Sequence, residues 1–447
     1  MVAEDSLNLL TDLIARAKAM GADAADALLV DQASLSVAFR LGRPEKVERS
    51  ESGDVGLRVF VGKRQAMVSS SDRGRQALDE LVERAVAMAR TVPEDPFCGL
   101  ADPSQLAREL PILDICDPVE PLPDQLVDWA QRAEDSARAV PGVTNSEGAE
   151  AGWGRSLVAL AGSNGLAHSY SSSGVSISAS VLAGDVAGGM ERDYDFSSAV
   201  YAADLRAPED IGHGAGHRAV RRLGARKVKT ARVPVVFDPR VSRGLLGHLS
   251  GAINGGAIAR GTSFLKDSLG KRILPAGVTV IDDPHRQRGL RSKPCDGEGV
   301  ANRRRAIVED GVLTTWLLDL RSARQLGLET TGHASRGVSS PPSPSVTNLW
   351  LEPGAVTPAE MISDIAEGFY VTELFGMGVN GVTGDYSRGA AGFWIAGGEI
   401  VHPVNEVTVA GNLKDMFLHL TAANDLHFHY GMDAPTVRID GLTVAGA

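Results

Sequence analysis

Residues 379–395 read VNGVTGDYSRGAAGFWI and form the most distinctive segment of the 447-residue chain. Small and turn-forming residues alternate with polar ones in its first half, and Gly392–Ile395 is typical of a strand. Glycine lets a backbone or a ligand approach closely, and the polar side chains could orient a peptide. The candidate residues of a substrate groove or an interface are Asn380, Thr383, Asp385, Tyr386 and Arg388. Residue types alone favour a simpler alternative, a glycine-rich β-turn with a structural Asp–Arg pair.

Short strand patterns and glycine-rich turns surround this segment from Val233 to the end of the chain. A helix is expected over Gly244–Ile258, where apolar residues recur at helical spacing. The basic stretch Gly224–Arg232 lacks apolar periodicity and marks a boundary before this region. We therefore expect residues 229–447 to form a C-terminal domain of mostly antiparallel strands with a few helices.

The first half of the chain mixes helical and strand patterns. Helices are predicted over residues 72–90, 125–139 and 207–223, and the Pro- and Asp-rich residues 91–124 read as a linker wrapped over the surface. The fold class is therefore α+β. It begins with an N-terminal α/β unit of mixed or antiparallel strands and helices (1–100), followed by a middle α+β unit (101–228).

Strand patterns near the N-terminus are short. Three separate runs are expected over residues 25–31, 34–41 and 47–52. Residues 56–62 alternate apolar and polar side chains, which predicts a strand with one buried face and one exposed face.

Composition excludes several classes of function. The 45 Lys and Arg against 56 Asp and Glu give a formal net charge of −11, which argues against a dedicated nucleic-acid binder. The three cysteines show no metal-like spacing, and no secretory signal is recognisable. No apolar run approaches the roughly 20 residues that cross a bilayer. We expect a cytoplasmic protein that binds neither nucleic acid nor membrane.

Two histidine pairs could begin a metal site. His213 and His217 have the spacing of HExxH zinc peptidases, but Gly214 occupies the position of the general-base glutamate. His427 and His429 would point the same way on a strand. No cysteine or carboxylate at a familiar spacing completes the second pair, so structural histidines are the favoured interpretation of both.

An ordered set of motifs resembles the TldD/PmbA family, and specifically its PmbA (TldE) branch. The likeness runs from end to end of the chain. Its motifs are Gly56–Gly62, Glu94–Phe97, Val379–Ile395, Pro403–Leu413, Asn424–Leu426 and Ala434–Gly446.

The resemblance implies a two-subunit protease in which the TldD branch binds a metal through an HExxxH helix and a later cysteine. Here the equivalent helix has Gly247 and Ala252 at the two histidine positions and His248 at the glutamate position. The later cysteine segment is missing, because Asn424–Leu426 runs by a short connection into Ala434. The resemblance therefore implies no catalytic residue and no metal in this chain, and zinc in a TldD-like partner.

The expected function is that of a non-catalytic subunit. It would pair with a TldD-like metallopeptidase as a heterodimer, shape a chamber and help admit unfolded peptides. A homodimer could also form when the chain is purified alone. Two alternatives stay open. One is a stand-alone metallopeptidase with a non-standard site built from His213, His217, His427 or His429. The other is a homodimeric, peptide-binding modulator.

Overall fold

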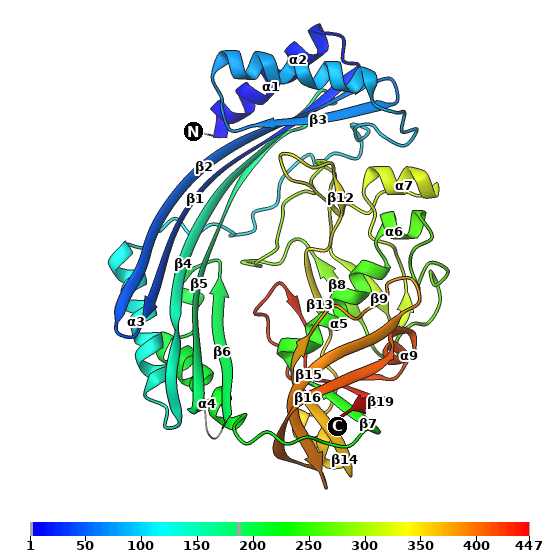
Figure 1. The fold of residues 1–447 in the computed structure, drawn as a ribbon. Helices are drawn as coiled ribbons and strands as arrows, with labels where there is room; N and C mark the ends of the chain where they lie inside the picture. Colours follow the sequence, from blue (N-terminus) through cyan, green and yellow to red (C-terminus); the bar gives the residue numbers. More distant parts are fainter. Residues whose placement is uncertain (1–2, 186–188, 447) are drawn as a thin grey trace.

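The computed structural model describes residues 3–185 and 189–446. A long, curved antiparallel sheet forms one side of the molecule, and the C-terminal part lies on the inner side of its curve (Figure 1). Both parts combine helices with mainly antiparallel strands, which confirms the predicted α+β class. None of the helices in these residues is both long enough and apolar enough to cross a membrane.

The large sheet has six strands in the order β3-β2-β1-β4-β5-β6. Their bounds are β1 Ala24–Arg40, β2 Arg43–Val61, β3 Arg64–Ser70, β4 Val143–Gly162, β5 Ala167–Asp185 and β6 Gly189–Ala199. The prediction of three short strands was wrong, since β1 runs without a break through the first two runs and β2 contains the third. The apolar pattern typical of a strand is interrupted in the middle of β1, because Gln32 and Ser34 are exposed there. The hydrogen-bonded ladder nevertheless continues through these residues.

Two pairs of helices cover the outer face of this sheet (Figure 1). Their bounds are α1 Ala3–Ala19, α2 Arg75–Thr91, α3 Pro123–Arg138 and α4 Pro208–Arg221, with a short 3-10 turn at Ala202–Asp204. Ala27 and Leu29 of β1 belong to the apolar core under α1 and α2, whereas Leu35 and Val37 belong to the core under α3 and α4. All four residues are odd-numbered positions of one strand, so both helix pairs lie on the same face.

The inner face of the sheet packs against the C-terminal part at the end near α1 and α2. Leu28 and Leu160 share an apolar cluster with Cys295. A Cβ on Gly56 would stand 2.0 Å from the carbonyl oxygen of Val338. Residues 55–60 are consequently buried on both faces. The prediction of one exposed face for residues 56–62 was wrong there, because the inner face is covered by a segment distant in sequence.

Residues 92–122 form no helix and no strand, as predicted, but they do not merely cross the surface. Leu106 makes a bridge with Val300, and Leu113 accepts a backbone hydrogen bond from Arg288. Leu113 and Ile115 are buried. The segment therefore ties the large sheet to the C-terminal part.

The C-terminal part contains a mixed six-stranded sheet in the order β16-β15-β14-β7-β19-β17, and a further pairing of β16 with β19 curls it back on itself. A five-stranded sheet has the order β10-β9-β8-β13-β18, and β11 pairs with β12. The strand bounds are β7 Ala231–Phe237, β8 Val280–Asp283, β9 Arg305–Glu309, β10 Val312–Leu313, β11 Ala334–Ser335, β12 Ser343–Pro344, β13 Asn348–Leu351, β14 Glu367–Phe375, β15 Asp385–Ala396, β16 Glu399–Asn412, β17 Leu420–Ala422, β18 Met432–Asp433 and β19 Val437–Ala445.

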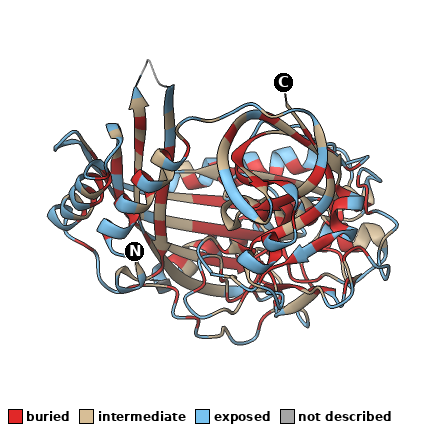
Figure 2. Ribbon diagram, turned by 90° about the horizontal axis from the view of Figure 1, so that it is seen from below, coloured by how far each residue is buried: buried red, intermediate tan, exposed pale blue. Residues whose placement is uncertain are grey.

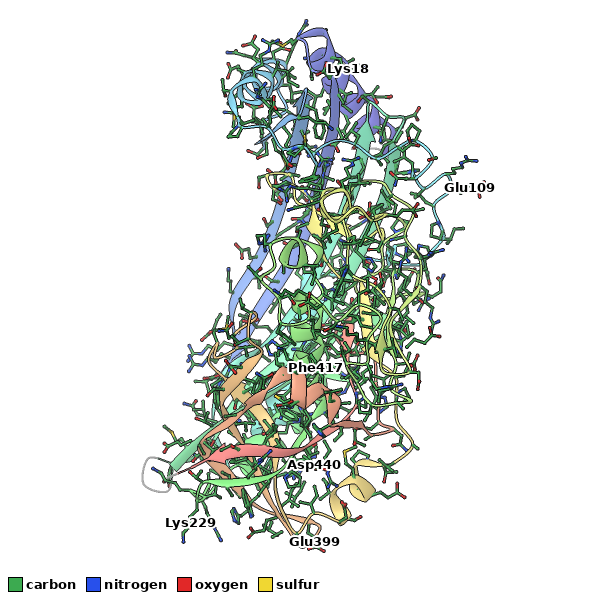
Figure 3. All side chains as sticks on the ribbon, turned by 90° about the vertical axis from the view of Figure 1, so that its right-hand side faces the viewer. Lys18, Glu109, Lys229, Glu399, Phe417 and Asp440 are labelled. Carbon is green, nitrogen blue, oxygen red and sulfur yellow. The ribbon has the colours of Figure 1, made fainter. Side chains whose placement is uncertain are left out.

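Within the described residues of this part, five helices lie between the strands. Their bounds are α5 Pro239–Ala252, α6 Gly255–Ala259, α7 Leu320–Leu326, α8 Pro358–Ser363 and α9 Leu413–Leu418. The single helix predicted over Gly244–Ile258 is two helices, because the side chain of Asn254 accepts a hydrogen bond from the Gly256 N–H and caps a new start. Buried residues gather along the strands of both parts (Figure 2). Lys18 lies at one end of the molecule, and Lys229 and Glu399 lie at the opposite end (Figure 3).

Candidate functional site

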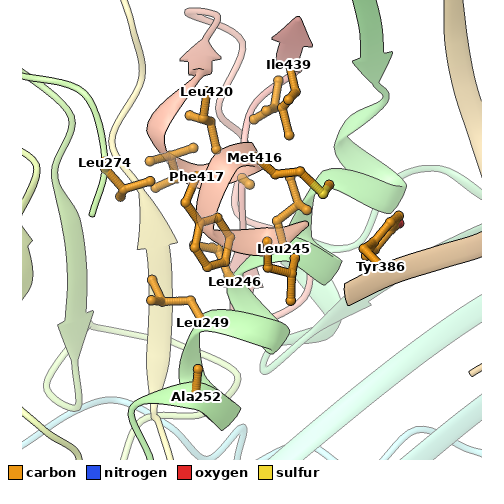
Figure 4. Close-up of a cluster of buried hydrophobic side chains, with 14 of the residues drawn as sticks. Leu245, Leu246, Leu249, Ala252, Leu274, Tyr386, Met416, Phe417, Leu420 and Ile439 are labelled. Carbon is orange, nitrogen blue, oxygen red and sulfur yellow. The ribbon is translucent and has the colours of Figure 1, made fainter. Parts of the chain in front are cut away.

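Helix α5 is fixed in the C-terminal core by one of its faces. Its N-terminus is capped by Asp238, whose side chain accepts a hydrogen bond from the Arg240 N–H. Leu246 and Leu249 are buried in the same apolar cluster as Phe417 (Figure 4). These leucines set the rotation of the helix, so the residues between them face the other way.

A cavity of about 370 Å³ lies against that other side of α5. The helix contributes Gly247, His248, Gly251 and Ala252 to its lining. The glycine-rich segment contributes Met377, Val379, Gly381 and Arg388. The structure thus joins two features that the sequence indicated separately, the degenerate motif positions and part of the segment 379–395.

His248 lines this cavity and packs against Tyr386, which is buried behind it. Their ring centroids are 5.9 Å apart and the ring planes are nearly perpendicular, at 81°. Burial, and then the positive charge of Arg388, lower the pKa of His248. Burial raises the pKa of Tyr386 to about 12. Both side chains are therefore neutral near pH 7, and Arg388 is the charged group beside them.

Three of the predicted groove residues form a turn instead of lining the cavity. The side-chain oxygen of Asn380 accepts hydrogen bonds from the backbone N–H groups of Val382 (2.9 Å) and Thr383 (3.3 Å). The Thr383 hydroxyl donates to Asp385 over 2.6 Å, and Asn412 donates to the other Asp385 oxygen over 3.1 Å. These two donors lower the pKa of Asp385. For these residues the turn interpretation accounts for the observed contacts.

Arg388 does not form the structural pair with aspartate that residue types favoured. Its Nε donates to the carbonyl oxygen of Phe375 over 3.4 Å, and its Nη2 donates to that of Leu374 over 3.3 Å. Within residues 3–185 and 189–446, no carboxylate lies within 4.0 Å of its guanidinium. The half-buried cation faces the cavity without an anionic partner.

The motif positions on α5 do not fit a catalytic zinc. Gly247 and Ala252 offer no donor atom, and His248 offers one imidazole, whereas catalytic zinc sites use three protein ligands. Across the described part of the chain, no three His, Cys, Asp or Glu side chains gather in an arrangement that could hold a metal ion. These residues therefore do not support a metal-dependent reaction at this site.

The first histidine pair lies on the outside of the molecule. His213 and His217 are exposed on α4, with ring centroids 4.4 Å apart. The intervening Gly214 is closely packed, because a Cβ there would stand 2.4 Å from a carboxylate oxygen of Asp195. Close packing against Asp195 therefore explains why glycine occupies the position of the motif glutamate.

The second histidine pair lies on a loop, so the expectation of a strand was wrong. The backbone N–H of His429 donates to Asp433 over 2.8 Å, and the same carboxylate accepts from Tyr430 over 2.9 Å. These contacts curl the chain and separate the ring centroids of His427 and His429 by 5.9 Å.

Part of the cavity wall was not among the candidate site residues that the sequence indicated. Phe264 and Leu413 complete the apolar lining together with Thr262. Phe264 reaches the site because its backbone N–H donates to the carbonyl oxygen of Gly381, and Leu413 because its N–H donates to that of Gly384. Both contacts join segments that are far apart along the chain, which local patterns do not predict.

The sequence and the fold of this chain match those of known proteins. Residues 25–89, 116–223 and 230–446 match the models of domain 1, the central domain and the C-terminal domain of the PmbA/TldA metallopeptidases. The metalloprotease PmbA of Escherichia coli O157:H7 is 40% identical over 426 residues, which cover 95% of this chain and 92% of that protein. The chain belongs to the TldD/PmbA family. The family resemblance seen in the sequence is therefore confirmed.

A further relative and two solved structures are also similar to this chain. A PmbA homologue from Haemophilus influenzae is 35% identical and covers 94% of this chain and 92% of its own length. The crystal structure of a candidate modulator of DNA gyrase from Bacteroides thetaiotaomicron has a TM-score of 0.92 at 27% identity, with both chains covered completely. TldE from Thermococcus kodakarensis has a TM-score of 0.88 at 21% identity, covering 98% of this chain and 100% of that one, which shows a shared fold.

Proposed function

We propose that this protein is a non-catalytic subunit of a TldD/PmbA-type metallopeptidase complex in the cytoplasm. It pairs with a TldD-like zinc peptidase and forms part of the chamber in which unfolded peptides are processed. The zinc and the general base belong to the partner.

The cavity-facing side of α5 is the observation that carries this proposal. The positions that match the family's metal motif are held by Gly247, His248 and Ala252, and they line a cavity instead of a ligand cluster. A zinc peptidase needs ligands for the metal and a base to take the proton from the metal-bound water. The leucines of α5 keep the helix in place, so the fold of the site is retained while its metal chemistry is not.

The inner face of the large sheet supports a chamber role. Beyond its contact with the C-terminal part, this face presents mainly serine and glycine. Such positions are Ser34, Ser36, Gly152, Gly154, Ser176 and Ser178. Small polar side chains leave room for an extended chain and offer hydrogen bonds to its backbone without selecting a sequence.

The test combines the purified chain with a purified TldD-like metallopeptidase from the same source. We expect a complex by size-exclusion chromatography at micromolar concentration. Elemental mass spectrometry should find zinc well below one equivalent in this chain and zinc in the partner. Only the complex should hydrolyse an unfolded casein peptide at full rate. Failure to form a complex, or one zinc per chain with hydrolysis by this chain alone, would contradict the proposal.

A double variant separates this proposal from a stand-alone peptidase. Replacing His213 and His217 by glutamine should leave the complex fully active, because both rings are exposed on α4 outside the cavity lining. Replacing His427 and His429 provides the matched second test. Loss of hydrolysis together with loss of bound metal in either variant would favour a histidine-based metallopeptidase.

A further inference from the structure

We propose that the cavity beside α5 binds the C-terminal end of a peptide, with Arg388 holding the terminal carboxylate and the apolar wall holding the last side chain. The inference rests on the proposed function and names the part of the substrate that this subunit holds.

The charge of the cavity favours an anion. The arginine guanidinium is a cation with five N–H donors in a planar fork that matches a carboxylate. Its two hydrogen bonds, at 3.3 and 3.4 Å, are long and go to neutral carbonyl groups. Among the described residues that line the cavity, none is Asp or Glu. A carboxylate would supply the missing countercharge through short, charge-assisted hydrogen bonds.

The remaining wall favours an apolar side chain. Phe264, Leu413, Val379 and Met377 lie around the cavity, and Met377 is 96% exposed at its rim. A volume of about 370 Å³ is at the small end of ligand pockets, which suits the last one or two residues of a peptide. A terminal Lys or Arg would meet a like charge in Arg388 and is therefore disfavoured.

His248 provides a second polar group near the anion. Its neutral imidazole carries one N–H donor, and Tyr386 packs against the ring and restricts its orientation. The guanidinium of Arg388 is close enough to lower the pKa of His248, after the larger effect of burial. A carboxylate bound by both side chains would reverse the electrostatic part of this effect.

Two glycines of α5 keep the floor of the cavity open. Apart from the chain neighbours and the backbone of α5, no atom of the described residues lies within 4 Å of a Cβ built on Gly251, and Met432 Sδ, at 3.9 Å, is the one such contact for Gly247. Glycine weakens a helix interior by about 1 kcal/mol relative to alanine. Its presence at two lining positions fits a need for space on this side of the helix.

Peptide binding to the full-length chain tests the inference. A fluorescein-labelled hexapeptide ending in leucine is titrated as the free acid and as the C-terminal amide, with fluorescence anisotropy as the readout. We expect the amide to bind about 10-fold more weakly or worse, since it cannot form the charged hydrogen bonds with Arg388. Arg388→Gln should weaken the free acid to the level of the amide and leave the amide unchanged.

A pair of glycine variants tests the location. Gly251→Leu fills the cavity from α5 and should abolish binding. Gly244→Leu is the matched control, because Gly244 lies on the same helix, outside the lining, and also has open space around its Cβ. Thermal unfolding and far-UV circular dichroism should show both variants folded.

Three results would overturn the inference. They are equal affinities of the acid and the amide, equal affinities of the two glycine variants, and no binding of either peptide at about 1 mM, a concentration that would detect an interaction of only about 4 kcal/mol. The titration needs no partner subunit. The inference can therefore fail while the complex forms, and the complex can fail to form while the peptide binds.

Discussion

The contact between the large sheet and the C-terminal part differs from the cavity beside α5 in whether its charged side chains form ion pairs. In the contact, Asp26 accepts hydrogen bonds from Arg58 (3.0 Å) and Arg336 (2.9 Å), and Arg58 also lies 3.7 Å from Glu298. All four side chains are buried. In the cavity, the half-buried Arg388 has no such partner among the described residues.

The two regions also use glycine differently. Gly56 at the contact lets the backbone of Val338 approach, whereas Gly251 in the cavity has open space around it. Paired charges around Asp26 and close packing therefore mark the place where two parts of the chain are held together. An unpaired cation beside open glycines is what the proposed binding of a peptide carboxylate requires.

The largest expected effect is on the buried cluster of Asp26, Arg58 and Arg336. Asp26→Ala should lower the free energy of unfolding by about 3–5 kcal/mol, because it leaves Arg58 and Arg336 buried without their shared carboxylate. Urea unfolding followed by circular dichroism measures the loss. The matched control is Asp12→Ala, which removes an exposed i,i+4 pair with Arg16 and should cost less than about 1 kcal/mol. Equal losses in the two variants would contradict the importance of the buried cluster.

The next comparison replaces one glycine in each region by alanine. Gly56→Ala should destabilise the protein by about 1–3 kcal/mol, because its Cβ would stand 2.0 Å from the Val338 carbonyl oxygen and the backbone must move. Gly251→Ala should instead stabilise α5 by about 0.5–1 kcal/mol, since nothing lies in its way. Thermal unfolding checks both signs. A loss in Gly251→Ala comparable to that in Gly56→Ala would show that the cavity is not open.

Local sequence patterns predicted many of the helices and strands but not the contacts between segments that are distant in sequence. Helix α5 and the segment 379–395 were both recognisable, because apolar spacing and turn residues act over short distances. Their meeting in one cavity depends on packing between residues more than a hundred positions apart, and Phe264 contributes to it without a local signal. Two-sided burial of residues 55–60 was missed for the same reason, since a distant loop covers the inner face.

A smaller effect should appear in the pH dependence of stability. Burial raises the pKa of Glu298 to about 8, although Arg58 opposes the rise. The folded state then keeps a proton that the unfolded state releases above about pH 4.5, so the free energy of unfolding falls between pH 4.5 and 8. Glu298→Gln cannot titrate and can still accept the hydrogen bond from the Leu320 N–H. We expect its advantage over the wild type to grow with pH between pH 5 and pH 8, by the order of 1 kcal/mol for each pH unit. A constant difference in thermal midpoint across this range would contradict the expectation.

The smallest and most local effect concerns the cation of the cavity. Arg388→Gln should raise the pKa of His248, because the guanidinium is one of the two causes that lower it. Burial is the larger cause and persists in the variant, so the pKa should stay below the usual value of 6.5. NMR of the protein with 13C-labelled histidine, assigned through His248→Gln, measures the titration. Arg388→Lys keeps the charge and should leave the pKa low. An unchanged pKa in Arg388→Gln would place the guanidinium too far from His248 for the two to share an anion, and the contrast between the paired contact and the unpaired cavity would then rest on the open glycines alone.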